Sequence, residues 1–297
     1  NINSPDPTYY RKMPSYYSSL YAPDNGEYSG AFTPDYENAE KSKAKFLAHP
    51  QIDWTALYRA NQNPIFDGNG TISGYEPAKS KYVLYEDQVE DETVAATTNL
   101  SAQLSENIFL NAGAAFKKLK SHNSQQLLDL LGGSCFEDID AFYNGDQSQS
   151  DLNNPDRQVG VGDTYGYNYN YFATTLEAFT QFKFTYNKVD FYLAQHFARA
   201  DYQREGLYKN GIYATNSFGK SEKVVFENFG FKAGFNLKIS GKQLVTFNAA
   251  HLTKAPSLRN TFANSRLNNS IVNDLESENT SSLDASYIYR SPKLKAR

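Results

Sequence analysis

The sequence contains almost no sulfur, since one cysteine, Cys135, and one methionine, Met13, occur among its 297 residues. A single cysteine excludes an intrachain disulfide framework and any metal site built from several thiolates. Tryptophan is equally scarce with one residue, although 23 tyrosines and 20 phenylalanines supply other aromatic side chains. The chain opens at Asn1 with neither an initiator methionine nor a signal peptide, so we expect it to be part of a longer protein.

Long apolar runs and fields of one charge are also missing. No stretch of 18 apolar residues occurs, so we expect no transmembrane helix. The net charge is only -4 and no run of Lys and Arg occurs, which argues against a nucleic-acid partner. A mean hydropathy of -0.64 is typical of a soluble protein, but a transmembrane β-barrel with half-polar strands and polar loops can share it.

Signatures of catalysis and metal binding are absent as well. The four histidines lie far apart in the sequence, without an HExxH motif, and no nucleophile stands near a base. We therefore predict no cofactor, no metal and no enzymatic activity. A membrane-bound hydrolase would need such a pair, so we rank it behind the two non-enzymatic functions considered below.

What the sequence does contain is a two-residue alternation. In "FTQFKFTYNKVDFYLAQHF", residues 179–197, large apolar residues occupy alternate positions on both sides of an Asn-Lys turn. Period 2 is strand geometry, because successive side chains of a strand point to opposite faces. The same pattern predicts hairpins over 93–118 and 223–253 and a seventh strand at 281–290. One predicted face carries Phe182, Phe184, Phe191, Leu193, Phe231, Phe235 and Phe247, and the other carries Glu177, Lys183, Asp190, His196, Lys232 and Asn236.

The lengths of the connections separate two kinds of β-protein. Short turns are predicted at 105–106, 187–188 and 240–241, and long loops at 121–168, 205–222 and 254–280. A soluble antiparallel sheet also shows alternation, but strict sorting of short and long connections is typical of outer-membrane barrels. We therefore predict an all-β fold: a partial transmembrane antiparallel β-barrel with long extracellular loops, formed by residues 81–297.

Residues 1–80 are predicted to form a long extracellular loop region without a strand ladder. They hold eight of the eleven prolines. Two short helices are expected there, one over 37–49 that stops at Pro50 and one over 53–62 with Asp53 as its N-cap. The strand spacing indicates about 30 residues per strand, so a plugged 22-stranded barrel would need roughly 660 residues. The seven strands expected here would be a third to a half of such a barrel.

Several stretches resemble the barrel of TonB-dependent outer-membrane receptors. They include "NSPDPTYYRKMPSYY", "IDWTALYRANQNP", "KYVLYEDQVEDET", "SDLNNPDRQVGVGD" and "KISGKQLVTFNAAHLTKAPSLRNTFANSR". The sequence is most similar to the Bacteroidota type, whose receptors begin with a carboxypeptidase-regulatory-like domain. The resemblance implies a 22-stranded barrel in the bacterial outer membrane, closed by a plug domain that is absent from this chain.

The same resemblance implies a function and partners. The function would be active uptake of a scarce, bulky solute, driven by TonB. The implied partners are outer-membrane lipid and lipopolysaccharide, TonB and the plug domain of the full-length protein, a surface lipoprotein, and a small-molecule, glycan or peptide substrate. The alternative is a surface barrel or adhesin that binds glycan or peptide without transport. A plug and a TonB box would distinguish the importer, and energy coupling rests on the resemblance alone.

Candidate ligand-binding residues lie in the predicted loops and the upper lumen wall. In "YGYNYNYF", residues 165–172, alternate tyrosines share one strand face where a long loop enters the bilayer. An aromatic girdle at the membrane interface is the favoured interpretation, and a stacking platform for a sugar or aromatic ligand is its rival. Arg259 and Arg266 could meet an anionic ligand or lipopolysaccharide phosphates, although solvated loop charges are the plainer explanation. The ligand-binding candidates are Tyr165, Tyr167, Arg259, Arg266 and His196.

Two acidic stretches suggest a cation site only weakly. An EF-hand loop that began at Asp67 of "DGNGTISGYE", residues 67–76, would need glycine at position 72 and glutamate at position 78. The sequence has Ile72 and Ala78 there, so a polar turn is favoured. The loop around 143–163 offers Asp146, Asp151, Asp156 and Asp163 to a hard cation. No spacing rule supports that site.

Overall fold

The computed structural model describes residues 6–19, 32–292 and 294–296. They divide into two compact units, which we describe separately. The first unit comprises residues 1–85, 127–137 and 158–163, and the second comprises residues 86–126, 138–157 and 164–297. Within the predicted loop region 1–80, residues 1–5 and 20–31 lie outside the described residues. No helix in the described part of the chain is long and apolar enough to cross a membrane.

The first unit contains three of the α-helices and two short sheets. Both predicted helices are confirmed, and each begins at an aspartate: Asp35 accepts a hydrogen bond from Asn38 N at 2.9 Å, and Asp53 accepts one from Ala56 N at 3.0 Å. These caps satisfy backbone N–H groups that have no partner inside the helix. The elements are η1 (Tyr10–Lys12), α1 (Pro14–Ser18), α2 (Tyr36–Ala48), α3 (Trp54–Ala60), β1 (Gln62–Phe66), β2 (Ile72–Pro77), β5 (Phe136–Glu137) and β6 (Gln158–Val159).

The prediction that residues 1–80 lack a strand ladder is wrong. β1 and β2 form an antiparallel hairpin, with Pro64 opposite Tyr75 and Ile65 opposite Gly74. Its turn is built by Asp67, whose carboxylate accepts hydrogen bonds from the backbone N–H groups of Asn69 and Thr71. The prolines and glycines of this stretch hide the alternation, because they are tolerated in a two-stranded ribbon whose strands are both edges.

One buried asparagine holds the chain segments of the first unit together. Asn61 is fully buried, and its side-chain amide donates to the carbonyl oxygens of Tyr82 and Leu130 at 2.6 and 2.8 Å. Its side-chain oxygen accepts from the backbone N–H groups of Lys81 and Tyr82. This residue belongs to the "IDWTALYRANQNP" stretch, so part of that motif is structural.

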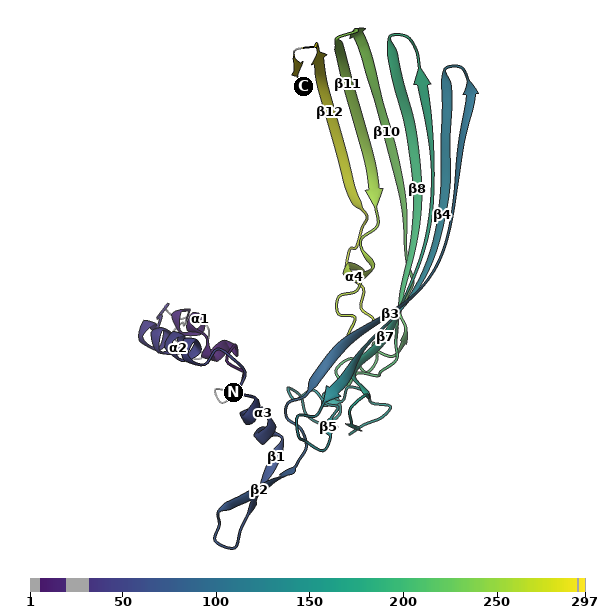
Figure 1. Ribbon diagram of the computed structural model, residues 1–297. Coiled ribbons are helices and arrows are strands. Elements are labelled where there is room, and N and C mark those ends of the chain that lie inside the picture. Colours follow the sequence, from purple (N-terminus) through teal and green to yellow (C-terminus); the bar gives the residue numbers. More distant parts are fainter. Residues whose placement is uncertain (1–5, 20–31, 293, 297) are drawn as a thin grey trace. The chain divides into compact units, whose positions relative to one another are not determined.

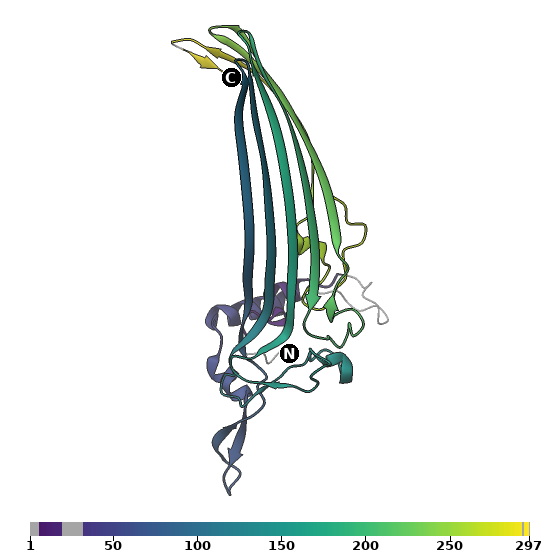
Figure 2. The ribbon, with the colours of Figure 1, turned by 90° about the vertical axis from the view of Figure 1, so that its right-hand side faces the viewer.

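The second unit is built on one large antiparallel sheet of long strands. Its nine strands follow the order β13-β12-β11-β10-β8-β7-β4-β3, with β9 paired to β8. The long strands lie side by side and bend together in one curved sheet (Figures 1 and 2). Short turns gather at one end of the sheet, and α4 lies toward the other end (Figure 1). The elements are β3 (Leu84–Ser105), β4 (Ile108–Asp129), η2 (Gly145–Ser148), β7 (Thr164–Thr185), β8 (Val189–Gly206), β9 (Gly219–Lys220), β10 (Val224–Ser240), β11 (Gln243–Lys254), α4 (Leu258–Thr261), β12 (Glu278–Arg290) and β13 (Lys295–Ala296).

The three predicted hairpins are confirmed, but several strands are longer than expected. β4 continues to Asp129 and β7 begins at Thr164, so residues 121–129 and 164–168 of the predicted loop 121–168 are strand. Polar residues occupy both faces in 121–126, and this removes the alternation by which a strand is recognised. The turn between β7 and β8 spans residues 186–188, one residue more than predicted.

The cross-strand register confirms the predicted division into two faces, because directly opposed residues point to the same face. Phe182 lies opposite Leu193 and Phe184 opposite Phe191, and Phe235 lies opposite both Phe191 and Phe247. We call this side the apolar face. The polar face carries the whole predicted polar set: Glu177, Lys183, Asp190, His196, Lys232 and Asn236.

The large side chains on the apolar face form a band of limited height. On β4, β7 and β8 it spans residues 108–116, 176–184 and 189–197, nine residues each, interrupted by Thr180 and Gln195. On β10 it begins at residue 229 and continues through 237 to the exposed Ile239 beside the turn. Many of its side chains are exposed, including Leu193, Phe229 and Phe231. We call it the apolar band. On the same face it gives way to a charged belt of Lys118, Arg199, Asp201, Lys223 and Glu227, in which Arg199 pairs with Glu227 at 3.2 Å and Lys223 with Asp201 at 3.1 Å.

The edge of the apolar band runs obliquely across the sheet. On β7 the last apolar residue is Leu176, whereas on β12 it is Leu283, which aligns through three intervening strands with Phe182. The edge therefore shifts by six residues over four strand spacings. At about 3.3 Å per residue and about 4.8 Å per strand, this edge slants by about 45°. The band also narrows toward β12, since on β11 it spans only residues 245–249.

Glycines on the polar face receive aromatic rings from neighbouring strands. A Cβ at Gly113 would lie 2.6 Å from the Phe179 ring, and one at Gly234 would lie 2.6 Å from the Tyr192 ring. Rings that cover strand glycines fix the register of a sheet. Phe179 therefore leans toward β4 and leaves space beside β8.

Candidate functional site

The polar face carries a groove of about 670 Å³ around His196, lined by β7, β8, β10 and β11. Small residues leave this space unfilled: Ala194, Ala198 and Ala200 of β8 have short side chains, and Gly230 of β10 has none. The size lies within the usual range of small-molecule sites.

Polar side chains from adjacent strands meet in this groove. His196 Nε2 lies 3.8 Å from Glu177 Oε2. Asn228 is only 1% exposed, and its side-chain oxygen receives no hydrogen bond from any residue that the structure describes. Lys232 and Lys254 also line the groove. Sequence reasoning found His196, Glu177 and Lys232 from the alternation, but Asn228 gave no signal.

The four alternate tyrosines of 165–172 lie on the polar face and are buried, each 6–7% exposed. The interface-girdle interpretation is therefore wrong, because a girdle needs rings on the apolar face that reach the surface. The connection between β11 and β12, residues 255–277, packs against them, and we call it the docked segment. The tyrosine cluster consists of Tyr167, Tyr169, Tyr171, Ala173, Ala200, Tyr202, Phe226 and Phe262, with Leu258, Ile271 and Leu275 of the docked segment packed against it.

A buried arginine holds the docked segment. Arg204 is 2% exposed and its guanidinium lies 5.0 Å from the Tyr169 ring. It donates to Ser265 O at 2.7 Å, to Ser217 O at 3.1 Å and to the Asn269 side-chain oxygen. Three acceptors from two connections thus converge on one side chain.

Arg266 makes a second contact between the docked segment and the strands. Its guanidinium donates to Asp87 of β3 at 2.6 Å and lies 4.7 Å from the ring of Tyr167, whose hydroxyl donates to the same carboxylate at 2.6 Å. Burial acts to lower the pKa of Arg266, but Tyr167 and Asp87 outweigh it and raise that pKa.

The five predicted ligand-binding residues do not form one site. Tyr167 and Arg266 are in contact, and Tyr165 is buried beside them on β7. Arg259 is exposed on α4. His196 lies in the groove.

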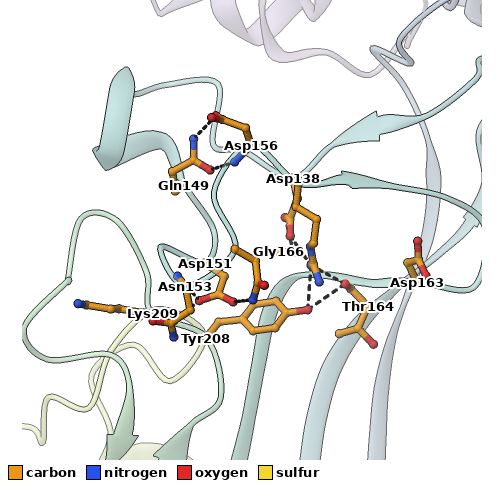
Figure 3. A network of polar contacts seen from close by, with 12 residues as sticks. Asp138, Gln149, Asp151, Asn153, Asp156, Asp163, Thr164, Gly166, Tyr208 and Lys209 are labelled. Carbon is orange, nitrogen blue, oxygen red and sulfur yellow. Dashed lines mark hydrogen bonds and ion pairs between the residues drawn. The ribbon is translucent and has the colours of Figure 1, made fainter.

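A polar network fixes the connections 138–157 and 207–211 (Figure 3). Asp138 accepts hydrogen bonds from Arg157 and from Gly166 N. Arg157 also donates to Thr164 O and to the Tyr208 hydroxyl. Burial raises the pKa of Tyr208, and Arg157 offsets part of this rise.

The aspartates proposed for a hard cation are engaged separately. Asp151 accepts from the backbone N–H groups of Asn153 and Lys209, whereas Asp156 pairs with the Gln149 side chain (Figure 3). In the described ranges, no group of three or more His, Cys, Asp or Glu residues is placed to hold a metal ion.

The scan against protein-family models gave no match for this chain, and the search of curated proteins gave none either.

Proposed function

We propose that this chain forms part of the wall of an outer-membrane β-barrel that imports a solute with energy from TonB. The observation that carries the proposal is the oblique apolar band. A bilayer-spanning strand needs about 9–11 residues and tilts by about 35–45°. The height of nine residues on β4, β7 and β8 agrees with the first value, and the slant of the band edge, about 45°, agrees with the second. An exposed apolar surface of this size in water would instead favour association or aggregation.

The opposite face supports an aqueous interior. Charged and amide side chains line it at the same depth as the apolar band, and the groove opens on it. In barrels too wide for side chains to fill, such a face lines a wet or plugged lumen. The apolar face would then contact lipid, and the polar face would contact the plug and the solute.

The two ends of the sheet support an orientation. The turns are short at one end, while the other end carries connections fixed by the Asp138 network and by Arg204 (Figures 1 and 3). Outer-membrane barrels place short turns in the periplasm and long loops outside. We therefore assign residues 138–157, 207–218 and 255–277 to the cell surface, in contact with lipopolysaccharide or a surface lipoprotein.

This orientation predicts how engineered cysteines react in intact cells. In a Cys135→Ser background of the full-length protein, Phe142→Cys should react with a membrane-impermeant maleimide, since Phe142 is 94% exposed. Gly241→Cys, in the turn between β10 and β11, should react only after the outer membrane is permeabilised. Its Cβ would be free of neighbours within 4 Å, so access is limited by the membrane alone. Equal labelling of both sites in intact cells would refute the topology.

Import itself is tested by depletion of solutes from the medium. Parent cells should remove at least one solute that cells lacking the full-length protein leave behind, and a plasmid copy should restore the removal. Collapse of the proton gradient with a protonophore should stop it, because TonB-driven uptake needs that gradient. If the protonophore leaves the removal unchanged, the protein binds its ligand without transport, as an adhesin does.

A further inference from the structure

Three acceptor groups surround one small residue in the groove. Glu177 of β7 and Asn228 of β10 both lie directly opposite Ala198, one on each side of β8. Two strand spacings of about 4.8 Å separate their backbones, and the alanine methyl leaves the space between their side chains open. His196 points to the same face two residues along β8, within 3.8 Å of Glu177. The Glu177 carboxylate and the His196 imidazole therefore flank this volume on one side, and the buried amide of Asn228 lines it on the other.

Among the described residues that line the groove, Asn228 has a side-chain oxygen without a hydrogen-bond donor. Its side-chain oxygen is buried and receives no hydrogen bond from the described residues. Native proteins rarely leave a buried carbonyl without a donor, because the loss of its hydration is then not compensated. The other two buried polar atoms without a partner, Arg157 Nε and Asn168 Oδ1, belong to residues that do not line the groove. The missing donor is therefore a local property of the groove.

The charges decide which donor fits. Glu177 has no Lys or Arg partner within the described residues, and its nearest basic group is His196. An ammonium group brings three donors and a positive charge, whereas a hydroxyl brings one donor and no charge. Lys232 and Lys254 also line the groove, so they would repel a ligand that carries a second positive charge besides its ammonium group. The side chain of Arg199 lies on the opposite face, where it is engaged with Glu227 and Asp201.

We propose that the groove binds the protonated amine of a small zwitterion, of the size of an amino acid or short peptide, above Ala198. This inference rests on the proposed function, because it takes the polar face to be the lumen wall along which the solute passes. Glu177, Asn228 and His196 receive the ammonium group, and Lys232 and Lys254 attract the anionic end. The volume of about 670 Å³ accommodates a ligand of this size.

The test uses the full-length protein in detergent, with triglycine and N-acetyltriglycine as probes in a calorimetric or NMR titration. Acetylation removes the ammonium group and keeps the carboxylate, so it should weaken binding by about tenfold or more. Asn228→Leu and Glu177→Gln should each weaken triglycine binding by a similar factor. Asn236→Leu, on the same strand and face, and Glu227→Gln, on the opposite face, should leave it unchanged.

A further variant separates the site from the fold. Ala198→Leu leaves the three acceptors in place but fills the volume between them, so it should abolish triglycine binding. Absence of triglycine binding to the parent protein, equal binding of the two probes, or unchanged binding in Asn228→Leu and Glu177→Gln would each overturn the proposal. If these results occur while Phe142→Cys and Gly241→Cys label as expected, they contradict only this inference and leave the proposed barrel supported. Failed labelling would remove the proposed function as well.

Discussion

Replacement of Arg204 by alanine is expected to release the docked segment from the polar face while the strands remain paired. The change leaves Ser265 O, Ser217 O and the Asn269 side-chain oxygen without their donor, in a site where Arg204 is 2% exposed. Unsatisfied buried acceptors cost about 1–3 kcal/mol each, so we expect a local loss of about 3–5 kcal/mol. Detachment of the segment limits the loss, because freed carbonyl groups then reach water.

Hydrogen exchange measures this release directly. The amide protons of Asn269 and Val272, which donate to Asn216 O and Thr261 O, should exchange roughly 10²-fold to 10³-fold faster in Arg204→Ala. Amides within β8 and β10 should keep their protection. Arg266→Ala is the matched control, because its ion pair with Asp87 is about half exposed and is worth at most about 1 kcal/mol. Equal exchange in the two variants would show that Arg204 does not hold the segment.

Arginine at position 193 is expected to oppose insertion of the sheet into a bilayer. Leu193 is 53% exposed and lies at the centre of the band segment 189–197, so a charge there would meet the middle of the hydrocarbon. For an outer-membrane barrel the cost is about 2–4 kcal/mol at that depth and about 0–1 near the interface. Leu237→Arg, on the same face at the turn end of β10, should therefore cost far less.

Denaturant titrations of the full-length protein in lipid vesicles compare the two variants. Leu193→Arg should lower the free energy of unfolding by about 2–4 kcal/mol, and Leu237→Arg by about 0–1 kcal/mol. Phe184 also lies at the turn end of the band, so an arginine there falls in the low range as well. If the two arginine variants lost the same free energy of unfolding, position along the apolar band would not correspond to depth in a membrane.

The hairpins and their two faces were predictable because each face keeps one kind of environment along the strand. Phe182, Phe184, Phe191 and Leu193 alternate with polar neighbours. This alternation can be recognised within one strand, without knowledge of which strand pairs with it. The N-cap at Asp53 was predictable for a similar reason, since the cap depends on a local hydrogen bond to Ala56, three positions ahead.

The rest depends on contacts between residues distant in sequence. Tyr169 and Tyr171 looked like an exposed girdle, because nothing local reveals that residues 255–277 cover them. Asn61 is pinned by carbonyl groups about 20 and 70 residues away, and Asn228 becomes special only through its place beside Ala198. Such roles need the register, which alternation alone does not supply.

In the proposed barrel, the strands that extend past the apolar band have a consequence for how a solute would arrive. On β7, residues 164–175 continue beyond the band, and twelve residues at about 3.3 Å span about 40 Å along the strand. With the slant of about 45°, the wall would rise nearly 30 Å above the lipid. A solute would then meet a tall vestibule among the surface sugars before it reached membrane depth. Capture and passage would be separate kinetic steps, and changes at the rim would alter the first step alone.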